Sequence, residues 1–216
     1  MTSTSPASTG TPATTARPAT ESAAPLAIRI GGIVGAVGAA AYISSFFLLA
    51  DLSGREAVRS PLCVTANMLM AVGYAVLALS LGSLHPRLPR WATTTAAAGC
   101  LVVAALAWGM ATFGADVAGW VTDERWDKPG TMTAVAFAPK MLLTGIGFAA
   151  VAFHGRRRRV ISLGAAVFLG FAALVSALPV PHPPGALVGG LALTWAAATA
   201  AQTPDRPIGP QPGPRS

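Results

Sequence analysis

Six long apolar stretches dominate the chain, and short segments rich in proline, glycine and arginine separate them. A helix needs roughly 20 apolar residues to cross the hydrocarbon core of a bilayer. The predicted spans are 27–50, 61–83, 92–115, 132–153, 160–179 and 185–202. The last stretch is the shortest, so five spans are the alternative. We predict an all-α integral membrane protein, a bundle of six transmembrane helices that forms one domain over 26–202.

Both ends of the chain lack the large apolar residues that a packed core requires. Residues 1–25 are mainly Ser, Thr, Ala and Pro, and residues 203–216 are rich in proline. Segments of this composition bury too little apolar surface to offset the entropy lost on ordering. We therefore predict a disordered tail at each end.

The positions of the basic residues predict the orientation. Lysine and arginine are enriched in cytoplasmic loops. With the N-terminus inside, the cytoplasmic side holds Arg17, Arg29, Arg87, Arg90, Arg156, Arg157, Arg158, Arg159, Arg206 and Arg215, and the outer side holds Arg55, Arg59, Arg125 and Lys128. Both termini are then cytoplasmic. Arg156 to Arg159 form the densest basic run, which suits an orientation anchor and also attracts anionic lipid headgroups.

The composition narrows the class of protein further. Hydrophobic residues make up 53% of the chain and charged residues 11%, with a net charge of +7. Because the basic residues lie in short loops between apolar stretches, we read them as topology signals and predict no nucleic-acid partner. The bilayer is the expected partner. The Ala- and Arg-rich composition is typical of a small bacterial protein, so the predicted location is the cell membrane, with several passes.

Lys140 is the residue that most favours a function. It lies well inside the apolar stretch 132–153, where an ammonium group costs on the order of 3 kcal/mol on insertion scales. Such residues usually face the protein interior and have a partner. Pro139 precedes it and leaves a backbone carbonyl without its helical hydrogen bond, which bends a helix and helps to form a cavity.

Other polar side chains are expected at a similar depth in the outer half of the bundle. At about 1.5 Å per residue, Asn67, Ser44 and Ser45 lie roughly 8 to 9 Å below the outer end of their spans, and Tyr42 and Lys140 about 12 Å below. Thr144 shares a helix face with Lys140. These six residues are the candidate binding residues. Asp51 and Asp116 are expected above them, near the outer rim.

Two interpretations of this cluster are open. In the first, Lys140 extends to the outer rim or pairs with Asp116, and the hydroxyl groups bond their own helices. In the second, the residues line a pocket open to the outer face, whose cation meets an anionic or polar group on a substrate, a lipid or a moving proton.

The sequence gives little support for a metal site, a cofactor or a disulfide. Cys63 and Cys100 differ in predicted depth by about 20 Å, which is beyond the reach of a disulfide, so we predict two free thiols. The three histidines do not form a metal-binding pattern. We predict no metal and no cofactor. Gly31 and Gly35 have the small-xxx-small spacing of a helix-packing face, which could also receive a partner helix.

Three functions therefore remain as hypotheses. The first is a small polytopic protein that binds or transports a small or lipid-like molecule at Lys140. The second is a cofactor-independent membrane enzyme of the cyclase or isomerase type, acting on a lipid or isoprenoid-like substrate, with its acid or base drawn from Asp51, Asp116 or Glu124. The third is an accessory or scaffold protein. The sequence leaves enzyme activity undecided.

Overall fold

The computed structural model describes residues 20–48, 54–82, 87–120, 131–178 and 183–202, and every element within them is an α-helix. Six of the helices are long, and the seventh has only six residues. The helices are α1 (Thr20–Leu48), α2 (Gly54–Arg59), α3 (Pro61–Leu81), α4 (Arg90–Trp120), α6 (Thr131–Arg157), α7 (Leu163–Ala177) and α8 (Pro183–Gln202).

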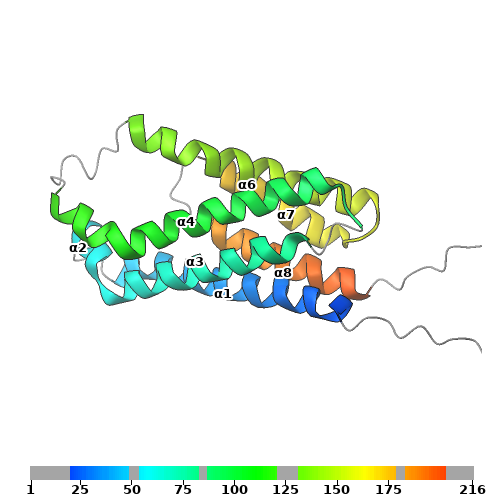
Figure 1. The fold of residues 1–216 in the computed structure, drawn as a ribbon, viewed down its shortest axis with the longest axis horizontal. Coiled ribbons are helices and arrows are strands. Elements are labelled where there is room, and N and C mark those ends of the chain that lie inside the picture. Colours follow the sequence, from blue (N-terminus) through cyan, green and yellow to red (C-terminus); the bar gives the residue numbers. More distant parts are fainter. Residues whose placement is uncertain (1–19, 49–53, 83–86, 121–130, 179–182, 203–216) are drawn as a thin grey trace, which may run out of the picture.

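The six long helices form a closed ring. In chain order each packs on the one before it, from α1 to α3, α4, α6, α7 and α8, and α8 packs back on α1 even more extensively than on α7. Successive long helices are antiparallel, so the start of α1 and the end of α8 lie at the same end of the bundle (Figure 1). The turn between α6 and α7, which carries Arg156 to Arg159, is at this same end. The short α2 lies at the opposite end, against α4.

Small side chains fill the interior of the ring, while large apolar side chains point outward. Alanines are the commonest buried residues, including Ala39, Ala92 and Ala96, each fully buried. Leu79, Val167 and Phe113 are among the many large hydrophobic residues left exposed, at 82%, 64% and 63%. A surface this apolar is unfavourable in water and suits a lipid environment.

Glycine allows α1 and α3 to approach until their backbones touch. A Cβ placed on Gly73 of α3 would lie 2.5 Å from the Cα of Gly35, and one on Gly31 would lie 2.8 Å from the backbone nitrogen of Leu77. Real Cβ atoms are not found at such distances, so any side chain here would push the helices apart. Gly31 and Gly35 therefore do form a packing face, and α3 of the same chain covers it.

The predicted all-α class is confirmed over the described residues, and each predicted span coincides with a long helix. Four helices are long and apolar enough to cross a membrane: Pro25–Ser45 within α1, Pro61–Leu81, Arg90–Trp120 and Phe137–Arg157 within α6. Helix α7 is also apolar but shorter, with 15 residues. These findings, which rest on helix length and composition, are compatible with a membrane protein.

Several helix boundaries differ from the prediction, and one short helix was not predicted. The N-terminal tail was expected to reach residue 25, but α1 begins at Thr20 and includes Pro25. Helix α4 continues past 115 to Trp120 and takes Asp116 into the helix. The segment before α3 contains the unpredicted α2, whose Arg55 and Arg59 donate to the carbonyls of Ala118 and Ala115 near the end of α4. Residues 1–19 and 203–216 lie outside the described residues.

Replacing Gly73 by leucine should separate α1 from α3 and destabilise the protein by roughly 3 kcal/mol, because overpacking of a tight interface cannot be relieved by side-chain movement. Thermal unfolding in mild detergent measures the effect. Gly109→Leu is the matched control, since a Cβ on Gly109 would meet no atom within 4 Å. Equal melting temperatures for the two variants would contradict the proposed role of this contact.

Candidate functional site

Lys140 lies inside the bundle, with 2% of its surface exposed. It follows Pro139 within α6, and the hydroxyl of Thr144 donates a hydrogen bond of 2.6 Å to its backbone carbonyl. Thr144 is also buried, at 1%. Among the residues that the structure describes, no carboxylate forms an ion pair with the Lys140 ammonium. The prediction that this lysine faces the protein interior therefore agrees with its burial.

The packing of α6 on α4 fixes the level of Lys140 in the bundle. A Cβ on Gly99 of α4 would touch the backbone of Thr144, and a Cβ on Gly147 would touch that of Ala96. Because the two helices are antiparallel, Lys140, one turn from Thr144, lies level with Val103. The stretch of α4 from Val103 to Asp116 spans about 20 Å.

This separation corrects the predicted relation between Lys140 and Asp116. No lysine side chain reaches 20 Å, and Asp116 is exposed rather than turned into the bundle. The interpretation that pairs Lys140 with Asp116 is therefore wrong, because the packing of Gly99 against Thr144 sets the lysine level with Val103 and not with the outer end of α4. The structure does not bring the two residues together.

A second group of polar side chains lies between α1 and α3. Tyr42, Ser45 and Asn67 are buried at 6%, 1% and 1%, and they surround Cys63. The Asn67 amide nitrogen donates to the Cys63 carbonyl at 3.0 Å and lies 3.8 Å from its sulfur, while the Ser45 side chain lies within hydrogen-bonding reach of the same thiol. Cys63 thus belongs to this group. The sequence analysis missed it, although its spacing of four from Asn67 places both residues on one face of α3.

One atom of this group has an unmet hydrogen bond. The Asn67 side-chain oxygen, Oδ1, is buried and has no hydrogen-bond partner among the described residues. A buried carbonyl without a partner is unfavourable by about 1–3 kcal/mol. The hydroxyl of Ser45, by contrast, donates to the Tyr42 carbonyl of its own helix at 2.7 Å. Asn67 Oδ1 is therefore free to accept a hydrogen bond from a ligand or a water molecule.

The remaining predicted site residues lie elsewhere. Ser44 is exposed on the outer surface of α1, one position away from the buried Ser45, because successive residues of a helix point in different directions. It does not line the interior. Asp51 and Glu124 lie outside the described residues. The Asn67 amide donates to Cys63 within the first group, and the Thr144 hydroxyl donates to the Lys140 carbonyl within the second.

At the level of Lys140, the described bundle contains fewer helices than at the end that carries Arg156 to Arg159. Gly145 of α6 packs beside Ala177, the last residue of α7, and Gly185 near the start of α8 packs on Ser176. Lys140 is more than one turn beyond Gly145, past the described ends of α7 and α8. At its level the described bundle consists of α1, α3, α4 and α6, which extend toward the end where α2 lies (Figure 1).

Comparison with known proteins adds no family to this description. No protein-family model, no curated protein and no solved structure matches the chain. Any function must therefore be argued from the residues themselves.

The two cysteines are free, as predicted, and both are buried, with exposures of 1% for Cys63 and 0% for Cys100. We expect a maleimide to label neither thiol in the folded protein in detergent and to label both after denaturation, with mass spectrometry counting the adducts. Rapid labelling of Cys63 before denaturation would show that the group around Asn67 is open to solvent.

Replacing Lys140 by methionine should stabilise the ligand-free protein by on the order of 2 kcal/mol, because it removes a buried cation that has no described counter-ion. Thermal unfolding in detergent measures the change. Arg90→Gln removes one exposed charge and serves as the control. A lower melting temperature for Lys140→Met than for Arg90→Gln would mean that the ammonium is already paired.

Proposed function

We propose that this protein binds an anionic or polar group of a small or lipid-like molecule at Lys140, reached from the outer face of the cell membrane, either to hold the molecule or to transport it. The observation that carries the proposal is a lysine that is 2% exposed, deep in an apolar bundle, with no described ion-pair partner. Buried charges are unfavourable unless they are paired, and intramembrane lysines commonly mark substrate or ion pathways.

The proposed topology has six membrane passes and both termini in the cytoplasm. The closed ring supports six passes, since α7 and α8 complete it between α6 and α1. The basic residues support the orientation, because the run from Arg156 to Arg159 lies at the end that α1 and α8 share. Helix α7 extends for only about 22 Å, which is less than the roughly 30 Å of a bilayer core.

The short α7 supports access from the outer face. If Arg156 marks the inner boundary of the membrane, Lys140 lies about 24 Å above it, beyond the reach of α7. The lysine is then within the outer part of the bilayer, close to the level at which two of the six helices have ended. A molecule entering there would need to displace fewer packed side chains than one entering from the arginine end.

The chemistry of the two polar groups supports a ligand with both charge and hydrogen-bonding capacity. Lys140 offers a cation and hydrogen-bond donors, whereas Asn67 Oδ1 offers a buried acceptor. A carboxylate or phosphate would meet the ammonium, and a hydroxyl or amine on the same or a second molecule would meet the amide oxygen. Both groups lie on the outer side of the central, alanine-rich part of the ring.

The enzyme and scaffold alternatives have less support. The enzyme alternative needs an acid or base beside Lys140, but Asp116 is about 20 Å along the bundle, and Asp51 and Glu124 lie outside the described residues. The scaffold alternative placed a partner at Gly31 and Gly35, and α3 covers both of these glycines. Binding or transport is the hypothesis that uses the buried lysine directly.

The test is a comparison of the small molecules that copurify with the wild type and with Lys140→Met, identified by untargeted mass spectrometry after purification in mild detergent. We expect an anionic or polar species that the wild type retains and the variant loses. Arg90→Gln, which removes an exposed cation, should retain it. The same molecules in all three proteins would contradict a lysine-dependent pocket.

Two further assays separate the functional classes once a molecule is known. A transporter moves it into sealed vesicles in response to an ion or pH gradient, whereas an enzyme converts it in detergent without any gradient. A protein that only binds does neither and retains the molecule unchanged. Flux lost in Lys140→Met and kept in Arg90→Gln would assign transport to this site.

A further inference from the structure

A groove on the exterior of the bundle runs between α6 and α7, near the end that carries Arg156 to Arg159. It is lined by Ala149, Ala152, Phe153, Arg156, Arg157, Ala166, Val167 and Gly170, and its volume is about 450 Å³. All the lining residues except the two arginines are apolar. The groove is separate from Lys140, which lies about 24 Å farther along α6 from Arg156.

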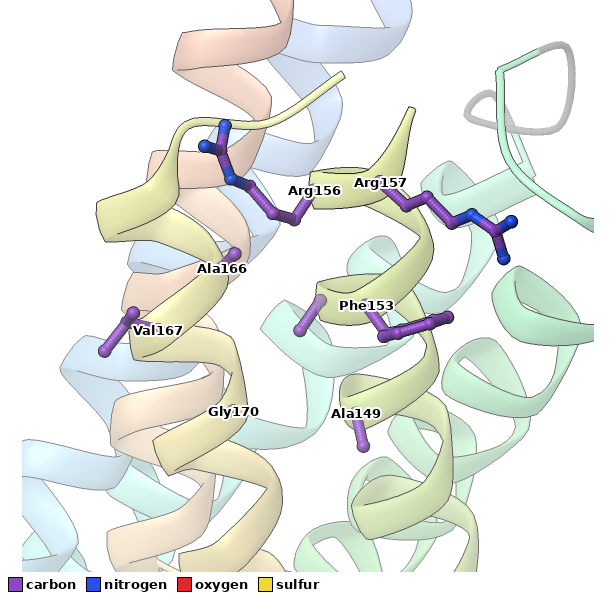
Figure 2. Close-up of a pocket in the computed structure, with 8 residues that line it drawn as sticks. Ala149, Phe153, Arg156, Arg157, Ala166, Val167 and Gly170 are labelled. Carbon is purple, nitrogen blue, oxygen red and sulfur yellow. The ribbon is translucent and has the colours of Figure 1, made fainter. Parts of the chain in front are cut away.

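Figure 2 shows how the two arginines are placed. The Arg156 side chain extends from the last turn of α6 toward α7, across the top of the groove, whereas Arg157 and Phe153 point to the other side of α6. Both arginines are exposed. Arg158 differs, because its guanidinium donates to the Arg87 carbonyl at 3.2 Å. Arg156 is therefore the guanidinium best placed to meet a group lying in the groove.

The floor of the groove is open because of a glycine that packing does not require. A Cβ on Gly170 would meet no atom within 4 Å. This differs from Gly31, Gly73 and Gly147, where any side chain would collide with a neighbouring helix. The absence of a side chain at Gly170 leaves open space beside exposed residues such as Val167 and Phe171.

We propose that this groove binds one acyl chain of an anionic phospholipid, whose headgroup phosphate pairs with Arg156. The apolar walls suit a hydrocarbon chain, and the cation at one end suits a phosphate, so the site and the lipid match along their length. The N-terminus of α7, beginning after the cap residue Ser162, is at the same end and adds a favourable dipole. Glu56 and Asp116 lie at the opposite end of the bundle, with α2 and the end of α4.

The test uses full-length protein reconstituted in nanodiscs that contain equal amounts of phosphatidylglycerol and phosphatidylcholine, followed by native mass spectrometry of the released protein. We expect the wild type to retain phosphatidylglycerol. Arg156→Gln should lower its apparent affinity roughly fivefold, the effect of about one cation at a lipid headgroup. Arg159→Gln removes a neighbouring exposed charge outside the groove and should retain the lipid.

Two glycine variants test the acyl-chain part of the proposal. Gly170→Leu should fill the groove and abolish retention, while Gly109→Leu adds the same side chain at another open position on α4 and should not. Neither substitution collides with a neighbouring helix, so both proteins are expected to fold. Equal retention by Gly170→Leu and Gly109→Leu, equal loss with Arg156→Gln and Arg159→Gln, or equal retention of the two lipids by the wild type would overturn the proposal.

Discussion

The close approach of α1 and α3 is the constraint on which the rest of the structure depends. Gly73 and Gly35 bring the two backbones together, and Gly32 of α1 meets Gly190 of α8 in the same way on its other side. With α1 held tightly by both neighbours, six helices can close into a narrow ring. Alanines are the commonest side chains inside this ring, and many of the large apolar side chains point outward, an arrangement that suits a lipid environment.

The same packing explains why Lys140 is unusual. Tyr74, the largest fully buried side chain, satisfies its hydroxyl by donating to the Ala186 carbonyl of α8. Lys140 is the next largest on that scale and has no comparable partner among the described residues. A narrow, alanine-rich interior leaves little room for unneeded volume or charge. This contrast is the basis of our proposal that the buried lysine, just beyond the described ends of α7 and α8, serves to bind a ligand.

The arginines at the two ends of the bundle make different contacts. At the end shared by α1 and α8, Arg87 donates to the Ala200 carbonyl near the end of α8, and Arg158 donates to the Arg87 carbonyl, so two arginines join three segments. These contacts hold the connections together, and Arg156 remains above the groove between α6 and α7. At the other end, Arg55 and Arg59 attach α2 to α4.

The sequence was sufficient for the helices and insufficient for the contacts between them. Long apolar stretches and prolines indicated the six long helices, and the cost of a buried ammonium indicated that Lys140 turns inward. Nothing local showed that α4 would carry Asp116 about 20 Å from the lysine, because that distance depends on which residues of α4 meet Thr144. Ser44 and Ser45 differ in burial through the rotation of α1. The groove beside Gly170 arises from two helices and has no signature in either one.

The most direct test of the account is the accessibility of position 140 from the outer face. In a protein lacking Cys63 and Cys100, the variant Lys140→Cys would be treated in sealed right-side-out vesicles with an anionic, membrane-impermeant thiosulfonate. The account predicts modification at position 140 and none for Val151→Cys, a fully buried position farther along α6. Modification only from the cytoplasmic side, or from neither side, would contradict a pocket that opens outward.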